Sequence, residues 1–122
     1  MAKNIYLAST GPKSGKSIIC LGLINAFRGM VTNVGYFKPI GQKYRTNEIH
    51  DKESIMIKEI YEIEDELKYI NPVSIKELNH HIANKEEEIF FQKIQKSYRT
   101  VEKNKNIVII DGTDYLGMKT TL

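Results

Sequence analysis

A short segment near the start of the chain has the residue types that bind a polyphosphate: Ser9-Thr10-Gly11-Pro12-Lys13-Ser14-Gly15-Lys16-Ser17. It lies between two apolar runs, 5–8 and 18–24, so the expected order is strand, loop and helix. In such a loop backbone N–H groups surround the phosphates, and the helix that follows directs its unpaired N–H groups and positive dipole end at the same anion. Lys16 then reaches the β- and γ-phosphates, and the Ser17 hydroxyl ligates Mg²⁺. The segment predicts a site for ATP, or another nucleoside triphosphate, with Mg²⁺.

The loop departs from the usual pattern at its first glycine. Thr10 stands at that position, and Gly11 follows one place later. The first glycine normally makes a turn that a side chain hinders. Either Gly11 makes this turn in a rearranged loop, or Thr10 directs its hydroxyl at the ligand. The alternative is a chance Gly-Lys-Ser in a turn before a helix, and the flanking apolar runs favour the phosphate loop over it.

A second group suited to this chemistry follows the most apolar run of the chain. The residues Ile107-Val108-Ile109-Ile110 are all β-branched, which predicts a central buried strand, and Asp111-Gly112 ends it. Ligands of open α/β sheets bind at the carboxyl ends of the strands. Asp111 is therefore predicted to hold Mg²⁺, directly or through water, as the acid of phosphate-loop proteins does. The alternative is that Asp111 caps a turn, and Asp114 is a weaker second candidate.

The elements that must position these groups form a parallel strand–helix–strand unit. A mostly apolar run over 4–9 predicts a strand buried on both faces, and 16–28 predicts a helix that buries Ile19, Leu23 and Phe27 and ends at Gly29. A second strand over 33–37 ends at Lys38-Pro39, because proline donates no hydrogen bond to a neighbouring strand. The polar stretch 40–48 predicts a loop.

The middle of the chain predicts helices. Met56, Ile60, Ile63 and Leu67 have helical spacing over 53–67. Ser74 with Glu77, and Asn84 with Glu87, have the spacing of helix-capping boxes. The helix after the second box has the strongest amphipathic pattern, with an apolar face made of Phe90, Ile94, Tyr98 and Val101.

Composition limits the class of protein. The 122 residues suit one domain, predicted over 1–122, and the net charge of +3 is too small to indicate nucleic-acid binding. Cys20, the single cysteine, forms no internal disulfide and reads as a buried apolar residue. No apolar run is long enough for a bilayer and the N-terminus lacks a signal-peptide layout, so a cytoplasmic protein without a membrane partner is expected. We expect an α/β fold of the P-loop NTPase type: three layers around an incomplete parallel sheet of about three strands.

Three motifs in order carry a resemblance to a known family. They are Thr10-Gly11-Pro12-Lys13-Ser14-Gly15-Lys16-Ser17, Val34-Gly35-Tyr36-Phe37-Lys38-Pro39-Ile40-Gly41 and Asp111-Gly112-Thr113-Asp114-Tyr115. Together they resemble the N-terminal, dethiobiotin-synthetase-like domain of long-form phosphate acetyltransferases, from the start of the chain to about residue 117. The synthetases also lack the standard first glycine of the loop.

This resemblance implies further site residues. The lysine-proline pair that contacts phosphate and substrate in the synthetases matches Lys38-Pro39, which makes Lys38 the candidate catalytic residue. The acid after the third strand matches Asp111, although the family usually has Glu-Gly there. A further acid near the metal matches Glu53 or Asp51, and Glu53 is preferred. The predicted nucleotide-binding residues are thus 10–17 and Lys38, and the predicted metal ligands are Ser17, Glu53 and Asp111.

The resemblance also separates the candidate functions. Acetyl transfer in the long acetyltransferases belongs to a C-terminal domain whose sequence is not seen here, and the synthetases are about twice as long, so we expect a truncated or cut chain. The first hypothesis is an ATP-binding module with a regulatory or structural role, which associates with itself or with an acetyltransferase domain. The alternatives are an ATP-dependent ligase of the dethiobiotin synthetase type and a non-catalytic interaction fragment.

Overall fold

A parallel three-stranded sheet forms the centre of the computed structural model, which describes residues 2–8, 16–42, 44 and 48–112. The strand order is β1-β5-β2, with β1 spanning Lys3–Leu7, β5 spanning Ile107–Asp111 and β2 spanning Val34–Phe37. In the register of the sheet, the last residues of β1 and β5 are Cα partners, Leu7 with Asp111. The predicted α/β class with a parallel sheet of about three strands is confirmed.

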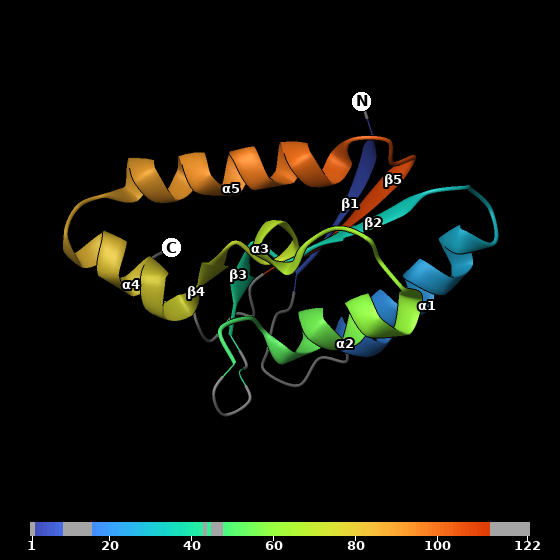
Figure 1. Ribbon diagram of the computed structural model, residues 1–122, viewed down its shortest axis with the longest axis horizontal. Helices are drawn as coiled ribbons and strands as arrows, with labels where there is room; N and C mark the ends of the chain where they lie inside the picture. The colour runs from blue at the N-terminus through green and yellow to red at the C-terminus, as the bar shows by residue number, and fades with distance from the viewer. Residues whose placement is uncertain (1, 9–15, 43, 45–47, 113–122) are drawn as a thin grey trace.

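Helices cover both faces of this sheet (Figure 1). The helices α1 (Lys16–Arg28) and α2 (Lys52–Tyr61) lie on one face, and α5 (Glu87–Glu102) lies on the other. Alternation along the strands builds the two cores: Tyr36 and Ile109 pack with Cys20 of α1, whereas Phe37 and Val108 pack with α5. The buried position of Cys20 agrees with its prediction as an apolar core residue.

A second sheet of two strands begins shortly after β2 in the chain. The strand β3 (Ile40–Gly41) pairs in parallel with β4 (Val73–Ser74), and these strands lie between the short helix α3 (Leu67–Ile70) and α4 (Ile75–Ala83). The predicted loop over 40–48 is therefore wrong at its start. Two residues are too few to give a strand pattern, and their pairing partner lies more than thirty residues further along the chain.

The first strand is more exposed than the sequence predicts. A strand buried on both faces was expected, yet Lys3, Asn4 and Tyr6 are exposed, Tyr6 at 61%. Among the described residues β1 pairs with β5 alone, so it is an edge strand. An apolar run predicts a strand, but the order of the strands decides whether it is central.

Two helix predictions need correction at their boundaries or faces. The helix predicted over 53–67 ends at Tyr61, because Glu62 adopts a left-handed conformation with φ of 50°, and Ile60 of its expected apolar face is 56% exposed. In α1, over 18–28, the fully buried residues are Cys20 and Ile24, which flank the predicted apolar positions, whereas Ile19 of that predicted face is 52% exposed.

Of the two predicted capping boxes, one is present and one is not. Ser74 and Glu77 form a complete capping box at the start of α4. Asn84 instead ends α4, and α5 begins after Glu86 without a side-chain cap, so the second box is wrong. The predicted face of α5 is confirmed, with Phe90 and Val101 buried.

Gly112 allows the end of β5 to approach β1 closely, and its replacement by alanine should be destabilising. Its N–H donates to the Leu7 carbonyl at 2.8 Å, and a Cβ added there would lie 2.6 Å from that same oxygen. Because a backbone atom cannot give way as a side chain can, we expect Gly112→Ala to lower the free energy of unfolding by about 1–3 kcal/mol. Urea denaturation measures this loss.

Gly22 provides the control for this substitution. It lies inside α1, and a Cβ added there would meet no atom within 4 Å. Gly22→Ala should therefore stabilise the chain by about 0.5–1 kcal/mol through helix propensity. Equal effects of the two substitutions would contradict the close packing at Gly112.

Candidate nucleotide and metal site

The candidate site lies where β1, β5 and β2 end. Phe37 at the end of β2 pairs with Ile110, so Lys38, which follows β2, and Asp111, the last residue of β5, lie at the same edge of the sheet. The end of β1 at Leu7 is level with Asp111. The strand that precedes the predicted phosphate loop in the sequence therefore ends beside Asp111, at the edge where open α/β sheets bind their ligands.

Three carboxylates surround the Lys38 ammonium. Its Nζ lies 3.4 Å from Asp51 Oδ1, 3.7 Å from Asp111 Oδ2 and 3.8 Å from Glu53 Oε2. The side chains of Lys38, Asp51 and Asp111 are at most 3% exposed, and that of Glu53 is 12% exposed. Ion pairs in such low-dielectric surroundings are screened weakly, so the charges of this lysine–carboxylate cluster depend strongly on one another.

The start of α2 brings two of these acids into position. Asp51 is its N-cap: Oδ1 accepts hydrogen bonds from the backbone N–H groups of Glu53 at 2.9 Å and of Ser54 at 3.4 Å. Its other carboxylate oxygen accepts from the Gln42 N–H at 2.8 Å. One buried side chain thus begins the helix and binds the Lys38 ammonium, so α2 cannot move without disturbing the cluster.

Asn71 holds the backbone on both sides of the cluster. Its Nδ2 donates to the Lys38 carbonyl at 2.9 Å, and its Oδ1 accepts from the Asp51 N–H at 2.9 Å. The Lys38 N–H in turn donates to the carbonyl of Ile70 at 2.8 Å. The end of α3 and the residue that follows it therefore fix the main chain at Lys38 and at Asp51.

Tyr36 contacts Asp111 from inside the sheet. Its hydroxyl donates to Asp111 Oδ2 at 2.7 Å, and Tyr36 itself is fully buried. Burial, followed by the negative charge of Asp111, raises the pKa of Tyr36 well above its usual value. Tyr36 therefore stays protonated, and remains a hydrogen-bond donor to Asp111, throughout the neutral pH range.

Several residues predicted from the sequence meet in this cluster. Lys38, Glu53 and Asp111 are brought together, and so is Asp51, the alternative to Glu53. Lys16 and Ser17 form the start of α1. The predicted loop residues Thr10 to Gly15, and Asp114, lie outside the described residues. The individual roles of all these residues remain predictions.

Two members of the site were missed. Tyr36 was placed only in the strand over 33–37 and in the second family motif, and no role was assigned to Asn71, the residue before Pro72. A signal for Tyr36 was present, because residues two apart in a strand share a face and Tyr36 stands two places before Lys38. Asn71 carried no comparable signal, since its partners lie far away in the sequence.

The carboxylate oxygens of the cluster are the type of ligand that binds a magnesium ion. Carboxylate oxygens are the ligands that Mg²⁺ prefers, and it binds them at about 2.1 Å while keeping several waters. The present spacing is that of an ammonium site, since Lys38 holds the oxygens between 3.4 and 3.8 Å from its nitrogen. Accordingly, within residues 2–8, 16–42, 44 and 48–112 no three acidic, histidine or cysteine side chains are grouped closely enough to hold a metal by themselves.

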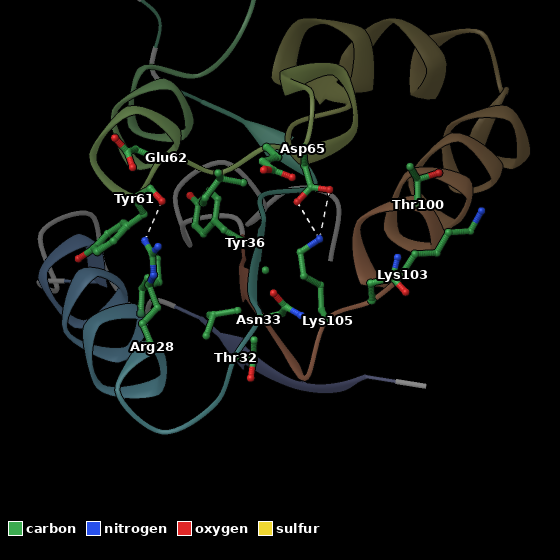
Figure 2. Close-up of a pocket in the computed structure, with 16 residues that line it drawn as sticks. Arg28, Thr32, Asn33, Tyr36, Tyr61, Glu62, Asp65, Thr100, Lys103 and Lys105 are labelled. Carbon is green, nitrogen blue, oxygen red and sulfur yellow. Dashed lines mark hydrogen bonds and ion pairs between the residues drawn. The ribbon is translucent and has the colours of Figure 1, made fainter.

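A cavity of about 530 Å³ lies at the other end of the sheet, beside the start of β2 (Figure 2). Figure 2 shows Lys105 extended toward Asp65, with Tyr36 nearby and Arg28 against Tyr61. Lys105 Nζ lies 3.0 Å from Asp65 Oδ2, and Arg28 donates to the Tyr61 carbonyl at 2.7 Å. Arg28 and Lys105, two of the three basic residues that line this cavity, are therefore bonded within the chain. Lys38, Asp51, Glu53 and Asp111 do not line it, although Tyr36 borders both the cavity and Asp111.

The parallel sheet, the helix that follows its first strand and the acids at the strand ends define a P-loop NTPase-like α/β domain. The chain matches the family described as an AAA domain over residues 3–122, and it belongs to that family. No helix in the part of the chain that the structure describes is both long and apolar enough to cross a membrane.

Curated relatives confirm the resemblance inferred from the motifs. The chain is 27% identical to a phosphate acetyltransferase of Nitratidesulfovibrio vulgaris, over 96% of this chain and 16% of that protein. A phosphate acetyltransferase of Synechocystis is 26% identical, over 96% of this chain and 17% of that protein. An ATP-dependent dethiobiotin synthetase of Caldicellulosiruptor saccharolyticus is 29% identical, over 90% of this chain and 47% of that protein. The chain thus spans less than half the length of each of these relatives.

Proposed function

We propose that this chain is a module that binds ATP, or another nucleoside triphosphate, together with Mg²⁺, and that it is related to the N-terminal domain of phosphate acetyltransferases. In this proposal residues 1–122 form one, partial, nucleotide-binding domain in the cytoplasm, and acetyl transfer is not assigned to them. Its partners are the nucleotide and either a second copy of the chain or an acetyltransferase domain.

One observation carries the proposal. Lys38, Asp51, Glu53 and Asp111 gather at the carboxyl ends of parallel strands, level with the end of β1, the strand that precedes the predicted phosphate loop in the sequence. A cation for the phosphates and acids for a metal are the two components that a metal–nucleotide complex requires. The first turn of α1 would add Lys16 for the β- and γ-phosphates and Ser17 for the metal.

The substitution Asp111→Asn tests the metal half of this proposal. It keeps the size and most of the hydrogen bonding of the side chain but removes the charge that a cation needs. ATP affinity measured calorimetrically with Mg²⁺ should fall by about 10- to 100-fold, whereas affinity measured with EDTA should change little. Asp65→Asn, at the opposite end of the sheet, is the matched control and should leave both affinities unchanged.

Two results would overturn the assignment. Equal losses with and without Mg²⁺ would make Asp111 a structural residue, and an absence of ATP binding by the parent chain would leave the interaction fragment as the function.

A ligase of the dethiobiotin synthetase type is the second candidate. It is favoured by the synthetase relatives, of which the chain covers 47%, a larger share than it covers of the acetyltransferases. Lys38 would then be its catalytic residue. ADP release from ATP in the presence of diaminopelargonic acid and bicarbonate separates the two candidates, because a module without catalytic activity releases none.

A further inference from the structure

The lysine–carboxylate cluster contains its own cation. We propose that Lys38 is the resident counter-ion of the nucleotide-free site: its ammonium holds the place of the metal and leaves it only when a metal–nucleotide complex arrives. The inference rests on the proposed function only for the identity of the incoming ligand, a metal–nucleotide complex. The competition between the ammonium and a metal ion does not depend on the proposed function.

Burial and position support this role for Lys38. Lys38 is 2% exposed, and its Nζ contacts carboxylates from two separate parts of the fold, the start of α2 and the end of β5. Removing such acids from water is costly unless a cation compensates them. The ammonium therefore supplies a compensating positive charge to the acids of the site and holds them together before any ligand binds.

The main chain at Lys38 is held while its side chain can move. Hydrogen bonds from the Lys38 N–H to Ile70 and from Asn71 to the Lys38 carbonyl fix the backbone on both sides of the residue. The ammonium sits on a flexible four-carbon stem with rotatable donors. Rotation of that stem carries the charge away from the carboxylates without unfolding β2 or β3.

The ammonium and a divalent ion exclude each other. Both seek the same carboxylate oxygens, Mg²⁺ needs some of them at about 2.1 Å, and two cations at such close range repel strongly in a weakly screened site. A triphosphate supplies the negative charge that draws the ammonium out of the cluster. Metal alone should therefore bind weakly, and metal with nucleotide should bind well.

Nucleotide-free binding of Mn²⁺ tests this competition. The probe is MnCl₂ alone, added to the full chain, with free Mn²⁺ quantified by electron paramagnetic resonance. Lys38→Met keeps the apolar stem and removes the charge, so this variant should bind one Mn²⁺ at least tenfold more tightly than the parent. The control is Lys105→Met, which removes a largely buried lysine from its ion pair with Asp65 and should leave Mn²⁺ affinity unchanged.

A thermal melt with and without Mn²⁺ covers the case in which Lys38→Met folds poorly. Mn²⁺ should then raise the melting temperature of this variant more than that of the parent, because it replaces the lost charge. Unchanged Mn²⁺ affinity of the variant, or its failure to gain stability from the metal, would overturn the inference. Tight Mn²⁺ binding by the parent without nucleotide would overturn it whatever the variant does.

The outcomes also separate this inference from the proposed function. Tighter Mn²⁺ binding by Lys38→Met in a chain that never binds ATP would support the counter-ion and refute the nucleotide site. Conversely, if the parent chain binds ATP but Lys38→Met leaves the Mn²⁺ affinity unchanged, the nucleotide site is supported and the counter-ion is refuted.

Discussion

Replacing Asp51 with alanine should lower the free energy of unfolding by about 3–5 kcal/mol, the range measured when one partner of a buried ion pair is removed. The Asp51 side chain is completely buried, and its loss would deprive Lys38 of the carboxylate oxygen that lies 3.4 Å from its Nζ. The same substitution removes the N-cap of α2 and the carboxylate oxygen that accepts a hydrogen bond from the Gln42 N–H. Urea denaturation followed by circular dichroism measures the effect.

Two further variants separate charge from capping at this position. Asp51→Asn keeps an oxygen that can cap α2 but loses the charge, so it should be less damaging than Asp51→Ala. Asp65→Ala removes a carboxylate from an ion pair whose side chains are 16–17% exposed and which caps no helix, so it should be less destabilising than Asp51→Ala. If Asp51→Ala were as mild as Asp65→Ala, the lysine–carboxylate cluster would not be the organising feature of this end of the sheet.

The second large effect concerns nucleotide rather than stability. Lys16→Ala should weaken ATP binding by about 10- to 100-fold, because hydrogen bonds to charged groups contribute roughly 1.5–3 kcal/mol and each 1.4 kcal/mol is a factor of ten. Lys16 is the first residue of α1, where the dipole of the helix also favours an anion. Fluorescence titration with a labelled ATP measures the loss.

An exposed lysine of β1 provides the control for this experiment. Lys3 stands at the start of that strand, at the end of the sheet opposite the predicted phosphate loop. Lys3→Ala removes the same charge and should leave ATP affinity unchanged. Equal affinities of the parent and Lys16→Ala would refute the phosphate loop.

The sequence predicted the elements that are set by local pattern. Four β-branched residues over 107–110 identified the central strand, and the Ser74–Glu77 pair identified the start of α4. Asp111 was found because it ends the apolar run over 107–110, and Lys38 was found through the lysine-proline pair of the family that the motifs resemble. Such signals are contained within a few neighbouring residues, so they need no knowledge of the fold.

The features that were missed depend on contacts between distant segments. Asn71 acts through Lys38 and Asp51, and Tyr36 acts through Asp111, 75 residues further along the chain. The exposure of β1 follows from the order of strands in the sheet, which its own residues do not encode. The local sequence around Tyr36 is that of an ordinary apolar strand, and that around Asn71 is that of an ordinary polar residue before proline. Neither local pattern indicates a neighbouring site.

The most direct test of the account is to map ATP and Mg²⁺ onto the backbone amides of the full chain by nuclear magnetic resonance. The account predicts chemical-shift changes at the start of α1 and around Lys38, Asp51 and Asp111. Amides beside the cavity at the start of β2, such as those of Asn33 and Lys105, should change little. Saturating ATP and Mg²⁺ that shift no amide, or that shift chiefly those of Asn33 and Lys105, would contradict it.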